Sequence, residues 1–373
     1  MSEPTTARKY YVGLDFLKAF AAIFIVLHHY QQMAGVGFSG VNFFVAPDLF
    51  QTEYVFGWLT ILFFMISGFL AAQQQMQQTT VRSVPAQIWH KCLRLYPMAM
   101  LACAAFVGMG FLHRLLLGDW YWPLGGGGLW TIFNSLLLTF ENGTVALPGI
   151  ADNNVTWYLS VLLNCCLIFY ILVWLGRRVQ VGWQWLCLFF FALACSLKSF
   201  GIAWPLLSVQ AGLCEGYIPF FLGVVLAKAA PYIPRRAKYA ELALPLVCLA
   251  AICGPFPGDW VENQWWMQAF MIYPPLVLAA ATWKDHGTAF DRAVNFLGQS
   301  SFAVYLWHCP LYSAWVLVQR LLGVQPTGTR WEMLLFLLAV ELLGAVLFTL
   351  VEKPLAQYSR RWEWDKLKIV DPV

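Results

Sequence analysis

The feature that most restricts the fold of this chain is a series of apolar segments, each about as long as a bilayer is thick. A helix needs about 20 apolar residues to cross the hydrocarbon core. Residues 13–30, GLDFLKAFAAIFIVLHHY, are the first such segment. Of the 373 residues, 60% are hydrophobic and only 11% are charged, whereas soluble domains carry about 25% charge. The sequence therefore predicts an all-α, polytopic integral membrane protein.

We expect about ten transmembrane helices in a single domain covering residues 1–373. They lie near residues 11–30, 54–72, 96–113, 157–176, 183–200, 206–227, 239–254, 265–283, 298–319 and 331–352. With a cytoplasmic N-terminus, 18 Lys and Arg residues fall in inside segments and 4 in outside segments. Because Lys and Arg accumulate in cytoplasmic loops, both termini are expected in the cytoplasm.

Two segments allow another interpretation. Residues 125–140, GGGGLWTIFNSLLLTF, have too short an apolar part for a span and are expected outside as an interfacial or re-entrant helix. The first segment could instead be a signal peptide, but Asp15 and Lys18 interrupt its apolar run and no clear cleavage site follows.

Composition also argues against two kinds of partner. The formal net charge of +4 is spread over the whole chain without a basic block, so we expect no nucleic acid partner. None of the ten cysteines forms a C-x-x-C pair and the six histidines are scattered. The cysteines are therefore expected to be packing residues, and no metal site is expected.

Ionisable residues within the first span indicate a functional face. Lys18 and His29 are eleven residues apart, which is close to three helical turns, so they lie on nearly the same face about 16 Å apart. His28 is turned away by about 100°. Charges at membrane depth usually face a partner or a polar cavity. The alternatives are that Lys18 snorkels toward the membrane surface or pairs with Asp15, and that His29 is an interfacial side chain.

Several strings together resemble the membrane-bound acyltransferase 3 family. Residues 13–30 resemble its first helix, in which an Arg is followed, after ten residues, by a His. Residues 63–70 (FFMISGFL), 91–97 (KCLRLYP) and 156–170 (TWYLSVLLNCCLIFY) resemble its second, third and W-x-L segments. Later segments of the family are resembled by three further strings, EGYIPFFLGVVLAK, SFAVYLWHCPLY and VEKP. The likeness covers essentially the whole chain, but no C-terminal SGNH-type esterase domain is expected.

The resemblance implies an O-acyltransferase that moves an acyl group, usually acetyl, from cytoplasmic acyl-CoA to a carbohydrate hydroxyl. The expected acceptor is a bacterial exopolysaccharide or another surface glycan, either lipid-linked or polymeric. The protein is then expected in the bacterial inner membrane, surrounded by lipid, without a metal. Histidine suits the proton transfer because its ordinary pKa is near neutral pH.

The candidate site residues follow from both lines of reasoning. His29 is the expected general base or acylated carrier, and Lys18 on the same face supports the donor. Lys91 and Arg94, one turn apart, are expected to bind CoA phosphates, with cytoplasmic anchoring as the alternative. Lys18 and Lys91 replace arginines of the family pattern, so they supply charge without a bidentate fork. Weaker candidates for substrate contact are Asp15, Ser67, Trp157, Glu215 and His308.

Each weaker candidate has a structural alternative. Glu215 and His308 could join helices by hydrogen bonds, Ser67 could belong to a close helix contact, and Trp157 could belong to the interfacial aromatic belt. For the whole protein, the alternatives are a secondary transporter, for which no repeated halves are visible, and a non-catalytic membrane sensor or scaffold.

Overall fold

The computed structural model describes residues 11–35, 59–77, 83–123, 154–200, 211–233, 264–283, 285–324 and 327–361. Within these ranges the chain is helical and contains no strand. The long helices are α1 (Val12–Ala34), α2 (Leu59–Gln77), α3 (Val84–Leu117), α5 (Trp157–Arg178), α6 (Trp183–Phe200), α7 (Ala211–Ala229), α12 (Ala289–Leu321) and α13 (Arg330–Leu347). Shorter elements are η2 (Asn154–Thr156), η4 (Ala230–Tyr232), α10 (Gln264–Met267), η6 (Gln268–Ile272), α11 (Tyr273–Thr282), η7 (Phe348–Glu352) and α14 (Lys353–Arg361).

The all-α membrane architecture is confirmed. Seven stretches of the described residues are long and apolar enough to cross a membrane, namely α1, α2, α3, α5, α6, α12 and the stretch Arg330–Tyr358. The expected span at 239–254 lies outside the described residues, as do the segment 125–140 and both termini. The expected spans at 206–227 and 265–283 coincide with helices α7, α10 and α11 where they are described. The count of ten and the orientation stay predictions.

Helix α3 is longer than the apolar segment that predicts it. Its expected span is 96–113, whereas the helix begins at Val84 after Ser83, with Pro85 in its first turn. Proline is favoured there because the first N–H groups of a helix have no intrahelical partner. The consequence is that Lys91 and Arg94 lie inside a regular helix of 34 residues, about 51 Å long.

Two pairs of helices form the centre of the bundle: α2 lies against α7, and α1 lies against α12. Glycines allow both contacts. A Cβ on Gly68 of α2 would overlap the carbonyl oxygen of Phe220, and one on Gly223 of α7 would overlap that of Met65. Likewise a Cβ on Gly298 of α12 would overlap Asp15 of α1. Small residues at such crossings are typical of membrane helices, since they let backbones approach closely. The expected packing role of the Ser67–Gly68 segment is confirmed for Gly68.

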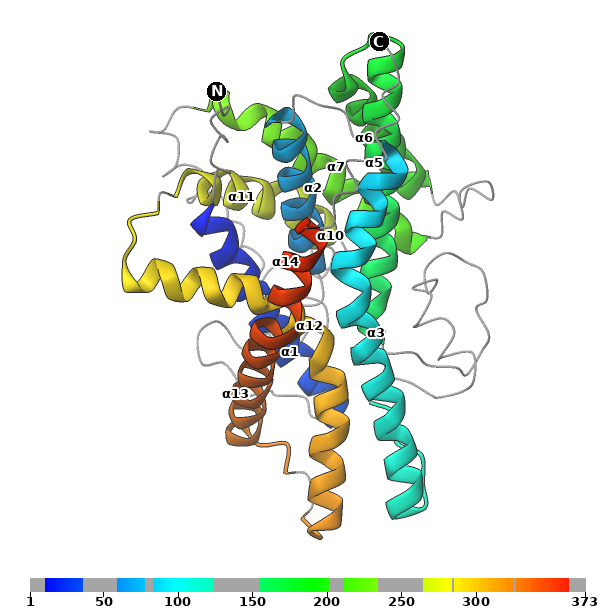
Figure 1. The fold of residues 1–373 in the computed structure, drawn as a ribbon, viewed down its shortest axis with the longest axis vertical. Helices are drawn as coiled ribbons and strands as arrows, with labels where there is room; N and C mark the ends of the chain where they lie inside the picture. The colour runs from blue at the N-terminus through cyan, green and yellow to red at the C-terminus, as the bar shows by residue number, and fades with distance from the viewer. Residues whose placement is uncertain are drawn as a thin grey trace.

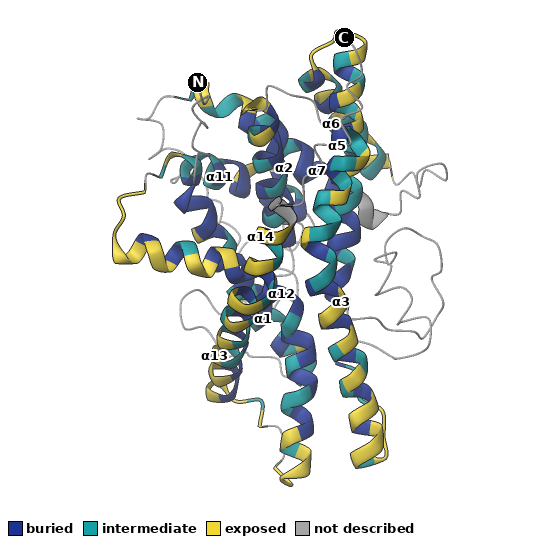
Figure 2. Cartoon of the chain, in the orientation of Figure 1, coloured by how far each residue is buried: buried dark blue, intermediate teal, exposed yellow. Residues whose placement is uncertain are grey.

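Large apolar side chains cover the periphery of the bundle. In Figure 2 exposed residues line the outer faces of α13 and of the lower part of α3. Phe189 of α6 and Leu335 and Leu342 of α13 are more than half exposed. Such a surface suits contact with acyl chains, where an apolar side chain needs no cover.

Two π-helical turns, η6 and η7, interrupt the regular helices. Proline follows each of them closely, Pro274 after η6 and Pro354 after η7. A proline donates no backbone hydrogen bond and clashes with the preceding turn, so a wider turn relieves the helix there. Glu352 is the last residue of η7 and is buried.

Figure 1 shows that α3 and α12 finish, and α13 begins, at the same end of the structure, drawn at the bottom. The positive-inside prediction places this end outside, and we call it the outer end. The opposite end, where α3 begins, is the inner end.

Candidate active site

A pair of histidines joins the two central helices α1 and α12. Nδ1 of His29 lies 2.7 Å from Nε2 of His308, and the rings stack with centroids 4.9 Å apart. His308 is fully buried. A hydrogen bond between two neutral imidazoles needs one N–H donor and one bare nitrogen, so each ring fixes the tautomer of the other. The sequence suggested both residues separately, and the fold brings them together across 279 positions.

His28 does not share this hydrogen bond. Its ring lies 5.5 Å from that of His29 at an angle of 50°, as expected for adjacent residues on different faces of a helix. His28 and His29 are both half-buried.

Two tyrosines extend the site from His308, Tyr305 on α12 and Tyr158 on α5. The Tyr305 ring lies 6.0 Å from that of His308, and its hydroxyl donates to the carbonyl of Val155 over 2.8 Å. Tyr158 packs edge-on to Tyr305 at 5.5 Å, and its hydroxyl lies 3.5 Å from Oγ of Ser67. Sequence reasoning missed both tyrosines, because nothing in their local pattern distinguishes them from packing residues.

Trp157 and Glu215 have partners on helices other than α1 and α12. Trp157 is half-buried and packs against Phe64 of α2. Glu215 of α7 forms an ion pair of 3.5 Å with Lys198 of α6, whose Nζ lies 4.3 Å from the Trp265 ring centroid. No interaction seen in the described residues links Glu215 to the histidine pair. Its alternative as a residue joining two helices therefore agrees with the structure.

A second polar cluster begins on α1, nearer the inner end, and we call it the inner cluster. Lys18 forms an ion pair with Asp15, one turn earlier. The Asp15 residue is 4% exposed and lies against Gly298 of α12. The proposed pairing of Lys18 with Asp15 is thus present, so the Lys18 charge is partly neutralised within α1.

Glu352 connects this cluster to α3. Its carboxyl group is buried, and the charges of Arg94 on α3 and Lys18 on α1 both act on it. Its Oε2 accepts no hydrogen bond from any described residue. The fold thus gathers Lys18, Arg94 and Glu352 from three distant parts of the chain. Sequence reasoning gave Glu352 no role, although the string VEKP contains it.

Lys91 faces a different neighbour. It is half-buried, and its charge acts on Cys166 of α5. Arg94 is exposed. Lys91 and Arg94 are three positions apart on α3, but the charge of Arg94 acts on Glu352, whereas that of Lys91 acts on Cys166. In the described part of the chain, no three His, Cys, Asp or Glu side chains gather as metal ligands would.

Fold and site together define a class: a helical, multi-pass membrane protein with a hydrogen-bonded histidine pair in its centre and a cluster of charges toward one end. The family model described as Acyltransferase domain, Acyl_transf_3, matches residues 11–350. The chain therefore belongs to the acyltransferase 3 family and is a membrane acyltransferase. No curated protein matches it, and no solved structure does.

Proposed function

We propose that this protein transfers an acetyl group, or a similar acyl group, from cytoplasmic acyl-CoA to a hydroxyl of a carbohydrate. The observation that carries the proposal is the 2.7 Å contact between His29 and His308. An alcohol attacks a thioester slowly unless a base removes its proton, and a positioned base contributes about 10² to 10⁴ in rate. A histidine oriented by a second group is a recurring arrangement for this task.

His29 donates its Nδ1–H to Nε2 of His308, which leaves the Nε2 lone pair of His29 free. That nitrogen takes the proton of the acceptor hydroxyl while the alkoxide oxygen attacks the thioester carbonyl. The carbon–sulfur bond breaks, and the thiolate of CoA receives the proton from His29. The products are an O-acyl ester and CoA.

A covalent variant uses the same nitrogen. Nε2 of His29 attacks the thioester carbonyl, the carbon–sulfur bond breaks, and CoA leaves as its thiolate. The acyl-imidazolium then passes its acyl group to the acceptor hydroxyl, and the hydroxyl proton goes to the CoA thiolate. Quenching the reaction in the absence of acceptor and analysing the protein by mass spectrometry distinguishes the two routes. An acetylated His29 peptide supports the carrier, and His29 that stays unmodified after incubation with acetyl-CoA alone supports the base.

The inner cluster is our proposed donor site. Arg94 is exposed and Lys91 half-buried on one face of α3, and guanidinium and ammonium groups bind phosphates by charge-assisted hydrogen bonds. Asp15 pairs with Lys18, and Glu352 lies under the charges of Arg94 and Lys18, so the cluster is only weakly positive and CoA must compete with two carboxylates. Lys18 lies about 16 Å from His29 along α1, and the pantetheine arm must cover that distance.

Our proposals for the acceptor and for the cellular membrane rest on membership of the family and not on a contact between residues. We propose an exopolysaccharide or another surface glycan as acceptor, and the bacterial inner membrane as location. A transporter or a non-catalytic scaffold of this family topology would bind no acyl-CoA and release no CoA, which makes donor turnover the decisive measurement.

The test uses the purified protein in detergent with radiolabelled acetyl-CoA. We expect release of CoA and transfer of label to added carbohydrate. His29→Ala should lower the rate by about 10² to 10⁴, while the matched His28→Ala protein should keep most of it. Lys18→Arg should be tolerated because it keeps the charge, whereas Lys18→Ala should weaken donor use. A monodisperse His29→Ala protein with normal turnover would refute the assignment.

A further inference from the structure

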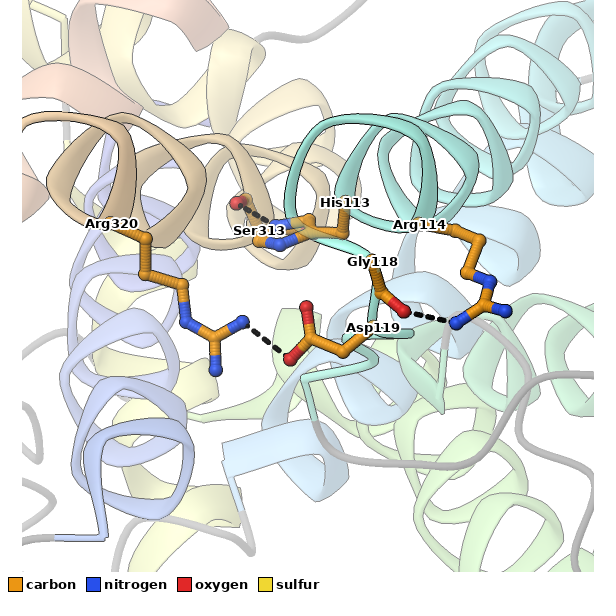
Figure 3. A network of polar contacts seen from close by, with 6 residues as sticks. All are labelled: His113, Arg114, Gly118, Asp119, Ser313 and Arg320. Carbon is orange, nitrogen blue, oxygen red and sulfur yellow. Dashed lines mark hydrogen bonds and ion pairs between the residues drawn. The ribbon is translucent and has the colours of Figure 1, made fainter.

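A third group of polar side chains lies at the outer end, between the C-terminal parts of α3 and α12. Figure 3 shows its members: His113, Arg114, Gly118, Asp119, Ser313 and Arg320. Arg320 forms an ion pair of 2.8 Å with Asp119 across the gap between the two helix ends. The hydrogen bond from Arg320 holds the pKa of the exposed Asp119 carboxyl below its usual value. We call this group the outer seam.

His113 is an unusual member of the outer seam because it is completely buried. Its Nε2 lies 2.9 Å from the carbonyl oxygen of Ser313. A carbonyl oxygen only accepts, so the proton of this contact sits on Nε2. In the neutral ring Nδ1 is then a bare acceptor, and no described residue donates to it.

Ser313 also carries an unpaired polar atom. Its side chain is buried, and its Oγ has no hydrogen-bond partner among the described residues. Buried polar atoms in folded proteins are nearly always paired with protein, water or ligand. Nδ1 of His113 and Oγ of Ser313 thus lie on two helices that the Nε2–carbonyl contact joins, and among the described residues each atom still lacks a hydrogen-bond partner.

Aromatic rings border the outer seam. The ring of Tyr121 lies 4.9 Å from that of His113, and the guanidinium of Arg320 lies 5.5 Å from its centroid. Beside it, Trp120 and Trp122 stack with centroids 5.7 Å apart. A sugar combines hydroxyl groups, which donate and accept hydrogen bonds, with C–H faces that pack on aromatic rings, so its chemistry matches this surrounding.

The outer seam also continues to the histidine pair. The hydroxyls of Tyr121 and Tyr312 interact, and the Tyr312 ring packs against Tyr30 of α1. Tyr312 follows His308 by four residues on α12, which is one helical turn, or about 6 Å. Tyr312 and Tyr30 thus connect the outer seam with the part of α1 and α12 that holds His29 and His308.

We propose that the outer seam is the acceptor subsite, in which a sugar hydroxyl donates to Nδ1 of His113 and accepts from Oγ of Ser313. This rests on the proposed transfer to carbohydrate and adds where the acceptor binds. It gives His113 a role in holding the acceptor and no role in the chemical step.

Accessibility tests the subsite without any turnover. Ser313→Cys replaces a hydroxyl by a thiol of similar size, and a membrane-impermeant maleimide added to intact cells reports whether it is reached from outside. Ser301→Cys is the matched control, because Ser301 is equally buried on the same helix and bonds to the carbonyl of Gly298. We expect labelling of Ser313→Cys well above wild type, and Ser301→Cys at the wild-type level.

The rate of maleimide labelling also measures sugar binding. The methyl glycosides of glucose, galactose and N-acetylglucosamine are the probes, and at least one should slow the labelling of Ser313→Cys. His113→Gln keeps a donor near the Nε2 position but loses the Nδ1 acceptor, whereas His113→Asn keeps an acceptor near Nδ1. When His113→Gln is added to the Ser313→Cys protein, the glycoside concentration that halves the labelling rate should rise by about two- to tenfold. This is the effect of losing one hydrogen bond. His113→Asn should raise that concentration less.

The outcomes separate the two proposals. Labelling of Ser313→Cys no faster than that of Ser301→Cys, or labelling that none of the three glycosides slows, overturns the subsite. If CoA is released from acetyl-CoA by the wild-type protein in the same experiment, the transfer function survives that result. Protection by a glycoside in a protein that never turns over acetyl-CoA would show that a sugar binds at the outer seam, but would overturn both the transfer and the role of the seam as an acceptor subsite.

Discussion

Replacing His308 by alanine should impair catalysis without removing the reacting histidine. The substitution deletes the nitrogen that lies 2.7 Å from Nδ1 of His29 and leaves the half-buried His29 ring without its partner. Leaving one buried partner unpaired costs about 1–3 kcal/mol. If this cost falls on the orientation of the imidazole in the transition state, turnover drops by about fivefold to 150-fold.

Two further substitutions at His308 test whether the lost hydrogen bond to His29 causes the effect. In His308→Gln the side-chain amide oxygen can occupy about the place of Nε2 and accept from His29, so activity should partly return. His308→Asn is one carbon shorter and should behave like alanine. His28→Ala is the control for a nearby ring, since His28 lies 5.5 Å from His29 and takes no part in the hydrogen bond.

A double-mutant cycle tests whether the two histidines act as one unit. His29→Ala alone should cost about 10² to 10⁴ in rate. Once His29 is absent, His308 has nothing to orient, so the double variant should be no slower than His29→Ala. Strongly non-additive effects are expected for residues that function together.

The assay measures initial rates of label transfer and of CoA release at saturating acetyl-CoA, so that kcat is compared. Each variant must elute as a single species and keep its thermal midpoint within a few degrees of wild type. Equal kcat for His308→Ala and wild type would refute the orienting role. Effects that multiply in the double variant would show that His308 acts independently of His29.

Three other predictions concern packing, donor binding and the outer end. Gly68→Ala forces a Cβ into the Phe220 carbonyl and should destabilise by about 1–3 kcal/mol, whereas Gly108→Ala, with open space at its Cβ, should not. A thermal midpoint unchanged by Gly68→Ala would contradict the close α2–α7 crossing. Arg94→Ala should weaken acyl-CoA binding by about 1.5–3 kcal/mol in calorimetry, while Arg114→Ala, at the other end of α3, should not. Equal affinities in the two proteins would reduce Arg94 to a topological anchor. Glu332 accepts hydrogen bonds from Trp315, Gln319, Thr327 and Gly328, so Glu332→Leu should lower the thermal midpoint. A midpoint equal to that of wild type would mean that these contacts are weak in the membrane.

Much of the fold was readable from the sequence because the bilayer imposes a simple rule. A segment in lipid must satisfy its own backbone hydrogen bonds, so each apolar run of sufficient length becomes a helix. The spans at 157–176 and 183–200 therefore agree closely with α5 and α6. The same rule missed the first three turns of α3, since their partly polar residues carry no signal of membrane depth.

On the first helix the sequence also determined the local geometry. Helical spacing placed Lys18 and His29 on one face and allowed the pairing of Lys18 with Asp15, since residues three apart on a helix are neighbours. These relations depend only on the geometry of a single helix.

Tertiary structure alone decided which distant residues meet. His308 could be named as an ionisable residue in a span, but its contact with His29 depends on how α1 crosses α12, and that crossing depends on Gly298 and Asp15 fitting together. Glu352 gains a role only because η7 brings it near Arg94 and Lys18. His113 and Ser313 stand 200 positions apart, and no local pattern links them. In a membrane, lipid surrounds every apolar face alike, so pairing of helices is decided by close packing and polar contacts between particular side chains, which a single sequence does not reveal.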